Sequence, residues 1–156
     1  FNEMSQQFGG LAGPLIVLEP GERWDPTHDL LFFVSDAPHG RAVMNGPGTS
    51  APAGLRVGST YRIRVADIAG DRSTMLVRVV QDSSLASWRP VAKDAFALPA
   101  TQATMRPSIA RVGSGETADF EFTPTKSGEL LLEVGSPRLT GGIDVEGTAR
   151  LHVTPP

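Results

Sequence analysis

The chain has 156 residues, about the size of one domain, and 40% of them are hydrophobic, which is enough for a core without disulfides or a structural metal. Its net charge of −3 argues against a nucleic-acid-binding protein, which needs clustered lysine and arginine. Cysteine is absent, which excludes disulfides, thiolate ligands and cysteine nucleophiles, and the sequence contains no run of about 18 apolar residues that could span a membrane.

Glycine and proline are spread along the chain and separate short runs rich in valine, isoleucine, leucine and phenylalanine. This spacing predicts many short strands joined by turns. In chain order we expect strands at residues 14–18, 29–35, 41–45, 60–68, 74–81, 89–93, 108–112, 117–123, 129–135 and 148–153. The strand at 29–35 is apolar on both faces, which predicts a place inside a sheet and not at its edge.

Two of these strands alternate apolar and charged side chains with a period of two, which is typical of a sheet with one buried and one solvated face. The charged positions, which we expect in water, are Arg62, Arg64, Asp119 and Glu121. The positions that we expect in the core are Phe32, Tyr61, Ile63, Val65, Phe120, Phe122, Leu130 and Leu132.

Helix signals are weak. We expect one short helical turn at residues 82–87, with Asp82 or Ser83 as its N-cap, and a second short segment at 99–104. With so little helix, two packed sheets are the natural architecture. We expect Trp88 to anchor a loop over the core, and Trp24 to pack on a neighbouring domain or lie exposed.

Residues 19–26 are rich in proline, glycine and charge and are predicted to be a linker. We therefore expect a terminal strand of a preceding domain at residues 1–18 and a sandwich at 27–156 that folds without it. A lone apolar strand recruits a partner. We expect it to dock on its own sandwich or to form a homo-oligomer through Pro14, Leu15, Ile16, Val17 and Leu18.

Several motifs, taken in order, resemble the multicopper oxidase family. "GLAGPLIVLEPG" resembles the end of the first cupredoxin domain, and "HDLLFFVSD", "MNGPG", "LRVGSTYRIRVADIA" and "WRPVAKDAFALPATQATMRPSIARVGSGETADFEFTP" resemble successive parts of the second. The resemblance covers nearly the whole chain. It implies an all-β, cupredoxin-like (plastocyanin-like) Greek-key sandwich with little helix.

The sequence departs from the family at specific points. Ala95 stands where a glycine is common, so that turn is not expected to take the usual left-handed geometry. Ala118 replaces a common aromatic residue. The His-X-His pairs and the His-Cys-His segment that hold copper in the family are absent, so no metal-binding, cofactor-binding or catalytic residue is assigned to this chain.

Other candidate site residues are better explained as structural. A blue-copper site needs two histidines and a cysteine, and we expect the histidines to be unrelated surface or turn residues. Of the methionines, we expect Met75 in the core and only Met4 exposed, while Asp67 and Asp94 are expected to cap backbone groups at strand ends and turns. The histidines meant here are His28, His39 and His152, and the other two methionines are Met44 and Met105.

The resemblance implies a copper-free scaffold domain, a fragment of an oxidoreductase that couples substrate oxidation to the reduction of dioxygen to water. Copper would be held in other parts of that longer protein, the parent, and neighbouring cupredoxin domains would be the partners. This chain alone would be inactive, and the resemblance implies a secreted or periplasmic location. The alternative from another class is a stand-alone binding or adhesion module of the immunoglobulin or fibronectin kind.

Overall fold

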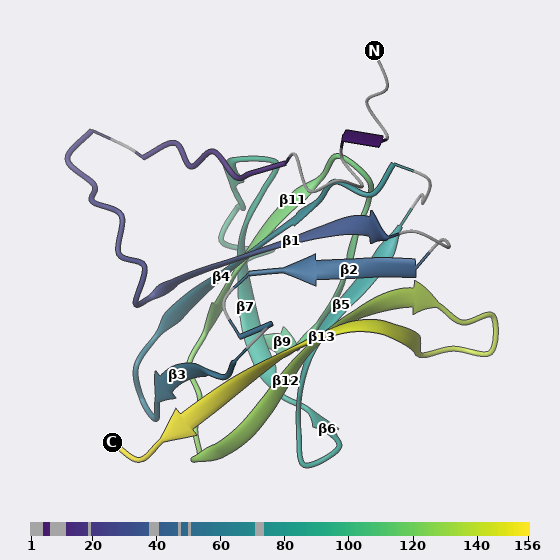
Figure 1. Ribbon diagram of the computed structural model, residues 1–156. Helices are drawn as coiled ribbons and strands as arrows, with labels where there is room; N and C mark the ends of the chain where they lie inside the picture. Colours follow the sequence, from purple (N-terminus) through teal and green to yellow (C-terminus); the bar gives the residue numbers. More distant parts are fainter. Residues whose placement is uncertain are drawn as a thin grey trace.

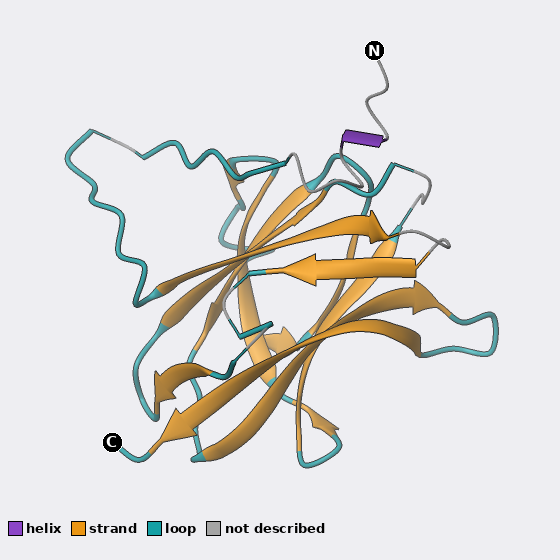
Figure 2. Cartoon of the chain, in the orientation of Figure 1, coloured by secondary structure: helices purple, strands orange, loops and turns teal. Residues whose placement is uncertain are grey.

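Two sheets lie face to face in the computed structural model, as Figure 1 shows. It describes residues 5–6, 12–18, 20–37, 41–46, 48–49, 51–70 and 74–156. Apart from a helical pair at residues 5–6, these residues form strands, turns and irregular connections (Figure 2). No helix among the described residues is long and apolar enough to cross a bilayer.

The first sheet has seven strands. β1 pairs with β4 in parallel, and the other neighbours in this sheet are antiparallel. β9 pairs with β7 beside the main path of the sheet. The order is β2 (Arg41–Asn45), β1 (Asp29–Ala37), β4 (Tyr61–Asp67), β11 (Thr117–Phe122), β7 (Ser87–Lys93) and β8 (Phe96–Ala97), with β9 at Arg106–Pro107.

The second sheet has six strands and is built around the long β12–β13 hairpin. β13 pairs with β3 in parallel, and β6 adds to β5. The order is β10 (Ile109–Val112), β5 (Met75–Gln81), β12 (Gly128–Pro137), β13 (Ile143–Thr154) and β3 (Ala53–Arg56), with β6 at Ser84–Leu85.

The core lies between the two sheets, and every residue predicted for it is buried, at 5% exposure or less. Its largest fully buried side chain is Trp88, which stacks on Phe120 with 3.9 Å between ring centroids. The prediction that Trp88 anchors a loop over the core was wrong, because it lies in β7 and its alternation with exposed neighbours turns it inward. Its indole Nε1 has no hydrogen-bond partner among the described residues.

A β-bulge in the β12–β13 hairpin connects the second sheet to β2 of the first sheet. We call this contact the seam. The pairing of β12 with β13 shifts register between Val134 and Gly135, which leaves Glu146 as the extra residue between Val145 and Gly147. Glu146 accepts hydrogen bonds from the backbone N–H of Ala42 at the edge of β2 (2.6 Å) and from the Ser136 hydroxyl (2.7 Å). The bulge thus aims one carboxylate across the seam.

A second side chain joins the sheets near β3. The hydroxyl oxygen of Tyr61, on β4, accepts a hydrogen bond from the backbone N–H of Arg56, on β3, at 2.8 Å. Tyr61 is only 5% exposed. A backbone donor on each of the edge strands β2 and β3 is therefore occupied by a side chain of the opposite sheet.

All strands expected from residue 29 onward are present. The short strands β3, β6, β8 and β9 were not predicted, and β13 begins five residues before its expected start. Residues 14–18, expected as a strand, lie outside the strands, and Leu15 and Val17 are 90% and 86% exposed. A strand needs a ladder partner, and none of the described strands pairs with this segment.

Of the two short helical segments expected, the one at residues 82–87 is absent, and the one at 99–104 is a single turn. Asp82 and Ser83 have φ values of 49° and 65°, so they form a tight hairpin turn between β5 and β6, because Gln81 pairs with Ser84. Residues 99–104 form one turn, in which the N–H groups of Gln102 and Ala103 donate to the Pro99 carbonyl. Strand pairing outweighed the local capping signal.

The turn at Asp94 and Ala95 is left-handed despite the alanine, which corrects the expectation from the sequence. Their φ values are 49° and 66°, as a two-residue type I′ hairpin requires between Lys93 and Phe96. The Asp94 N–H donates to the Thr117 carbonyl, and its carboxylate accepts from the Thr117 N–H at 2.9 Å. These contacts hold the alanine in a conformation that glycine adopts without strain.

Replacing Phe120 by alanine should lower the free energy of unfolding by about 3–5 kcal/mol, because it removes a buried ring and leaves a cavity beside Trp88. Urea unfolding followed by tryptophan fluorescence measures the loss. The matched control is Phe96→Ala, whose ring is 79% exposed and which should change stability by no more than about 0.5 kcal/mol. A loss below about 1 kcal/mol at Phe120 would contradict its core position.

Ala95→Gly should raise the free energy of unfolding by about 0.5–1 kcal/mol. The left-handed penalty of roughly 1–2 kcal/mol that it relieves exceeds the extra unfolded-state entropy of glycine. The same denaturation experiment applies. As a control, Ala97→Gly in the neighbouring strand should destabilise the chain, and a destabilised Ala95→Gly would show that the turn is not strained.

Candidate functional site

The outer face of the seven-stranded sheet carries a row of charged side chains with alternating sign. Antiparallel pairing sets Asp119 opposite Arg64 and Glu121 opposite Arg62. Because their neighbours in sequence turn inward to the core, these four side chains all turn outward, as the alternation predicted. Asp119 does not lie in water as expected, because its neighbours on the sheet cover it and leave it 9% exposed. The row is the main cluster of ionisable groups that the fold gathers on this face.

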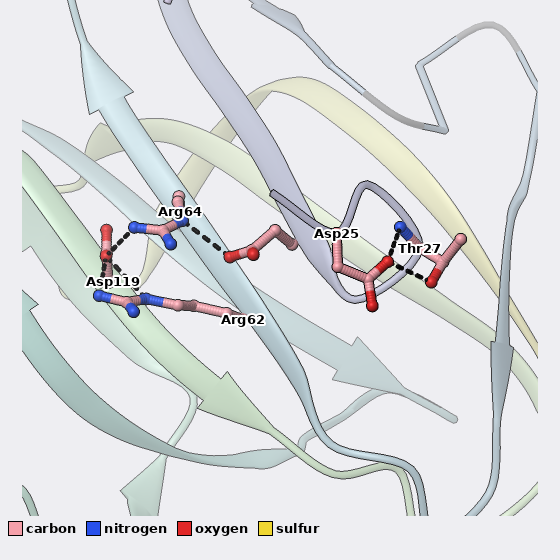
Figure 3. A network of polar contacts seen from close by, with 6 residues as sticks. Asp25, Thr27, Arg62, Arg64 and Asp119 are labelled. Atoms are coloured by element: carbon pink, nitrogen blue, oxygen red, sulfur yellow. Dashed lines mark hydrogen bonds and ion pairs between the residues drawn. The ribbon is translucent and has the colours of Figure 1, made fainter. Parts of the chain in front are cut away.

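Asp119 joins two arginines of the row, as Figure 3 shows. Its Oδ2 accepts hydrogen bonds from Arg64 Nη1 and Arg62 Nε, each at 2.9 Å, and lies 2.7 Å from Arg62 Nη2. Arg64 Nε donates to Asp29 Oδ1 on β1 at 2.9 Å. The side chains of Asp29, Arg64 and Asp119 are only 13–17% exposed, so these ion pairs are partly screened from water.

The row continues onto β7 through the ion pair of Arg89 with Glu121. Positive and negative groups therefore alternate across β1, β4, β11 and β7. Each carboxylate of the row is already paired with a guanidinium group, and none lies free beside a nucleophile. The row is suited to holding four strands in register and not to acid–base catalysis.

A turn fastens the connector, residues 20–28, to the end of this sheet. The Asp25 carboxylate accepts hydrogen bonds from the N–H of Thr27 at 2.9 Å and from its hydroxyl at 2.5 Å (Figure 3). His28 Nδ1 lies 2.8 Å from the other Asp25 oxygen, and the His28 ring stacks on Tyr61 with 5.2 Å between centroids. The Thr27 hydroxyl, with the His28 ring and the Thr27 N–H, lowers the pKa of Asp25 to about 2.

The connector and the sheet line an open, polar pocket of about 210 Å³. The sheet contributes arginines and carboxylates that are already engaged in the row, and the connector contributes one acidic and one basic residue. The pocket is lined by Leu18, Glu22, Arg23, His28, Asp29, Thr60, Tyr61, Arg62, Arg64 and Glu121. No apolar cleft with convergent polar groups is formed there, so the pocket by itself assigns no substrate.

The residues that the sequence offers for a metal do not converge. His28 is engaged with Asp25 and Tyr61, His152 is an exposed residue of β13, and His39 lies outside the described residues. Across the parts of the chain that the structure describes, no three histidine, aspartate or glutamate side chains group as metal ligands. With cysteine absent from the sequence, the donor set does not fit a blue-copper centre.

The methionines are dispersed. Met75 is fully buried, as predicted, and Met44 is 7% exposed. Met105 is 64% exposed, which corrects the expectation that only Met4 is exposed, because Met105 ends an edge connection and does not face the core. Met4 lies outside the described residues.

Asp67 and Asp94 act on the backbone, as predicted. Asp67 Oδ1 accepts a hydrogen bond from the Ala69 N–H at 2.9 Å, and Asp94 accepts from Thr117. Trp24 is 38% exposed in the connector. The sequence had no signal for the stacking of His28 on Tyr61 or for the bulge at Glu146, since both depend on segments that are distant in the chain.

No protein-family model and no curated protein matches this chain. Solved structures do match. A multi-copper oxidase from Pediococcus acidilactici has a TM-score of 0.58 and 11% identity over 94% of this chain and 29% of that chain. The copper-containing nitrite reductase from Thermus scotoductus has a TM-score of 0.60 and 15% identity, covering 83% of this chain and 31% of that one.

A blue copper oxidase from Nitrosomonas europaea has a TM-score of 0.56 and 14% identity, over 81% of this chain and 43% of that chain. At such low identity the likeness concerns the fold: the chain is a cupredoxin-like β-sandwich, as the motifs predicted. The chain spans less than half the length of each of these three proteins.

The turn at Asp25 should make the stability of the chain depend on pH in acid. Because the pKa of Asp25 falls from 3.8 to about 2 on folding, its carboxylate stabilises the fold above pH 3.8, and this contribution is lost as the pH falls through 2. Urea unfolding between pH 2 and 5 should show a larger gap between wild type and Asp25→Asn at the upper end.

The cause can be tested separately with Thr27→Val, which removes the hydroxyl donor and keeps the N–H. In an NMR titration of the Asp25 carboxyl, this variant should move the pKa of Asp25 upward toward 3.8. An unchanged pKa of Asp25 would mean that the Thr27 hydroxyl is not its main cause.

Proposed function

We propose that this chain is a copper-free, cupredoxin-like scaffold domain from a larger oxidoreductase of the multicopper oxidase type. In this proposal residues 1–18 are the last strand of a preceding cupredoxin domain, 19–26 are the linker and 27–156 are the scaffold domain. The parent protein oxidises its substrate and reduces dioxygen to water, with its copper ions held by other domains. It is secreted or periplasmic.

The observation that carries the proposal is the combination of this fold with a donor set that does not fit its usual metal. The similar structures are copper proteins by name, and this chain corresponds to only 29–43% of the three described above. Proteins of that size leave room for other domains to hold the metal. A copper-free sandwich beside them has a spacing role.

The outer sheet face supports a scaffold role as well. Its ion pairs join β1, β4, β11 and β7 into one unit, and the Trp88–Phe120 stack lies directly behind them. A domain that spaces two redox domains has to be stiff, because small displacements change the distance between cofactors. The extended segment with exposed Leu15 and Val17 fits a strand that completes its sheet in a neighbouring domain.

A stand-alone binding or adhesion module of the immunoglobulin or fibronectin kind is the alternative, because such modules are also β-sandwiches. The sequence that flanks the chain in its gene separates the two. His-X-His pairs and a His-Cys-His segment beyond residue 1 or 156 support the scaffold proposal. A tandem array of similar sandwiches without these ligands supports the binding module and overturns the proposal.

The chain by itself should bind no stoichiometric copper. The expectation follows from the donor set, since it has no thiolate and no group of three potential metal ligands among the described residues. Metal analysis after dialysis against copper and then a weak chelator measures the retained metal. His28→Ala and His152→Ala serve as controls that identify loose surface binding.

One tightly held copper per chain, with strong visible absorption, would contradict the scaffold role. Copper retained by wild type and lost from both histidine variants would point to adventitious binding at exposed imidazoles. That result would leave the scaffold proposal in place.

A further inference from the structure

The connector is joined to the second sheet of the sandwich by three contacts in series. His28 Nδ1 lies 2.8 Å from Asp25 Oδ2 in the turn that leads into β1. The His28 ring stacks on Tyr61 of β4, with 5.2 Å between ring centroids and 19° between ring planes. The Tyr61 hydroxyl oxygen accepts a hydrogen bond from the Arg56 N–H of β3 at 2.8 Å. The series therefore runs from the connector, through the first sheet, to an edge strand of the second.

The strand at the end of this series is short and has one ladder neighbour. β3 has four residues, and among the described strands it pairs with β13. The Arg56 N–H is bound to a side chain of the first sheet and not to β13. A short edge strand opens more easily than the centre of a sheet. The attachment of β3 therefore depends in part on the position of the Tyr61 side chain.

The connector and β3 also face each other directly. They line an open pocket of about 350 Å³, to which Thr27 and His28 contribute from the connector and Leu55 and Arg56 from β3, with Tyr61 between them. The turn at the end of the connector thus covers one end of β3. Moving this turn away would admit water to the hydrogen bond between Tyr61 and the β3 backbone.

The two halves of the series differ in burial. Tyr61 is 5% exposed, whereas the side chains of His28 and Asp25 are 51% and 53% exposed. The outer contacts can therefore break while the core stays packed. Before them in the chain, Gly21 has a φ of 94°, and a Cβ added there would meet nothing within 4 Å. A glycine in open space can change its backbone conformation at little steric cost.

We propose that Asp25, His28 and Tyr61 form a latch, by which the connector and the edge strand β3 are held or released together. When the latch is closed, the chain before Asp25 leaves the sandwich in a fixed direction and β3 is held against the first sheet. When the latch opens, both loosen while the core stays packed. The linker of the proposed function then bends at Gly21 and not where it meets the sandwich. The inference uses contacts within one chain and does not depend on the copper-free role.

Hydrogen exchange of the Arg56 amide, followed by NMR, reports the state of the latch. In His28→Ala this amide should exchange at least about tenfold faster, since an open latch weakens its one hydrogen bond. The matched control is Trp24→Ala, a connector residue outside the latch, which should leave the rate unchanged. The Ala86 amide, which donates to the Val79 carbonyl beside the edge strand β6, should keep its rate in both variants. Unchanged Arg56 exchange in His28→Ala, or equal acceleration at Ala86, would overturn the proposal.

A second measurement tests the coupling from the other end, because coupling between two sites is reciprocal. Tyr61→Phe keeps the ring that stacks on His28 and removes the hydroxyl that holds β3. Acrylamide quenching of tryptophan fluorescence reports the connector, since Trp24 is 38% exposed and Trp88 is fully buried. Quenching should increase in Tyr61→Phe.

The control for this measurement is Ser59→Ala, which alters the same pocket without touching the latch and should quench like wild type. Near-UV circular dichroism of Trp88 confirms that each variant is folded. Wild-type quenching in Tyr61→Phe, with faster Arg56 exchange, would mean that Tyr61 only bridges the two sheets. That result would refute the latch.

Discussion

The antiparallel pair of β4 and β11 carries two kinds of side chain that need opposite environments, and the organisation of the sheet depends on keeping them apart. Inward, aromatic and aliphatic residues of both strands pack around the Trp88–Phe120 stack. Outward, Asp119 joins the guanidinium groups of Arg62 and Arg64. A slip of β11 by one residue against β4 would place Phe120 and Phe122 in water and Asp119 and Glu121 in the core. The register is therefore fixed strongly, and β1 and β7 are positioned by their pairing with this central pair.

The two edges of the first sheet, at β2 and at β8, differ in their contacts. The seam beside β2 is closed because the bulge at Gly135 turns Glu146 toward a backbone donor. At that position a Cβ would lie 1.9 Å from the Asp144 carbonyl oxygen, so only glycine allows β12 to approach β13 there. The opposite edge of the seven-stranded sheet, at β8, has only uncharged side chains in residues 95–105.

A cupredoxin-like fold without a copper donor set shows that the architecture and the metal chemistry are separable. The sandwich is stabilised by its core and by ion pairs across its strands, and these contacts involve none of the ligands that a blue-copper centre needs. The fold therefore does not depend on those ligands, as the proposed scaffold role requires.

The sequence by itself determined the all-β class, the central strands and the core, because alternation with a period of two reports which face of a strand is buried. It also determined that a thiolate copper site cannot form, since that follows from composition. Only the tertiary structure decided the rest. Asp82 and Ser83 form a hairpin turn and not a helix because β5 pairs with β6, and Ala95 is left-handed because β7 pairs with β8. The ion pairs of Arg64, the seam at Glu146 and the stacking of His28 on Tyr61 join residues far apart in the chain. Local sequence patterns carry no information about such contacts, because their geometry exists only once the sheets have formed.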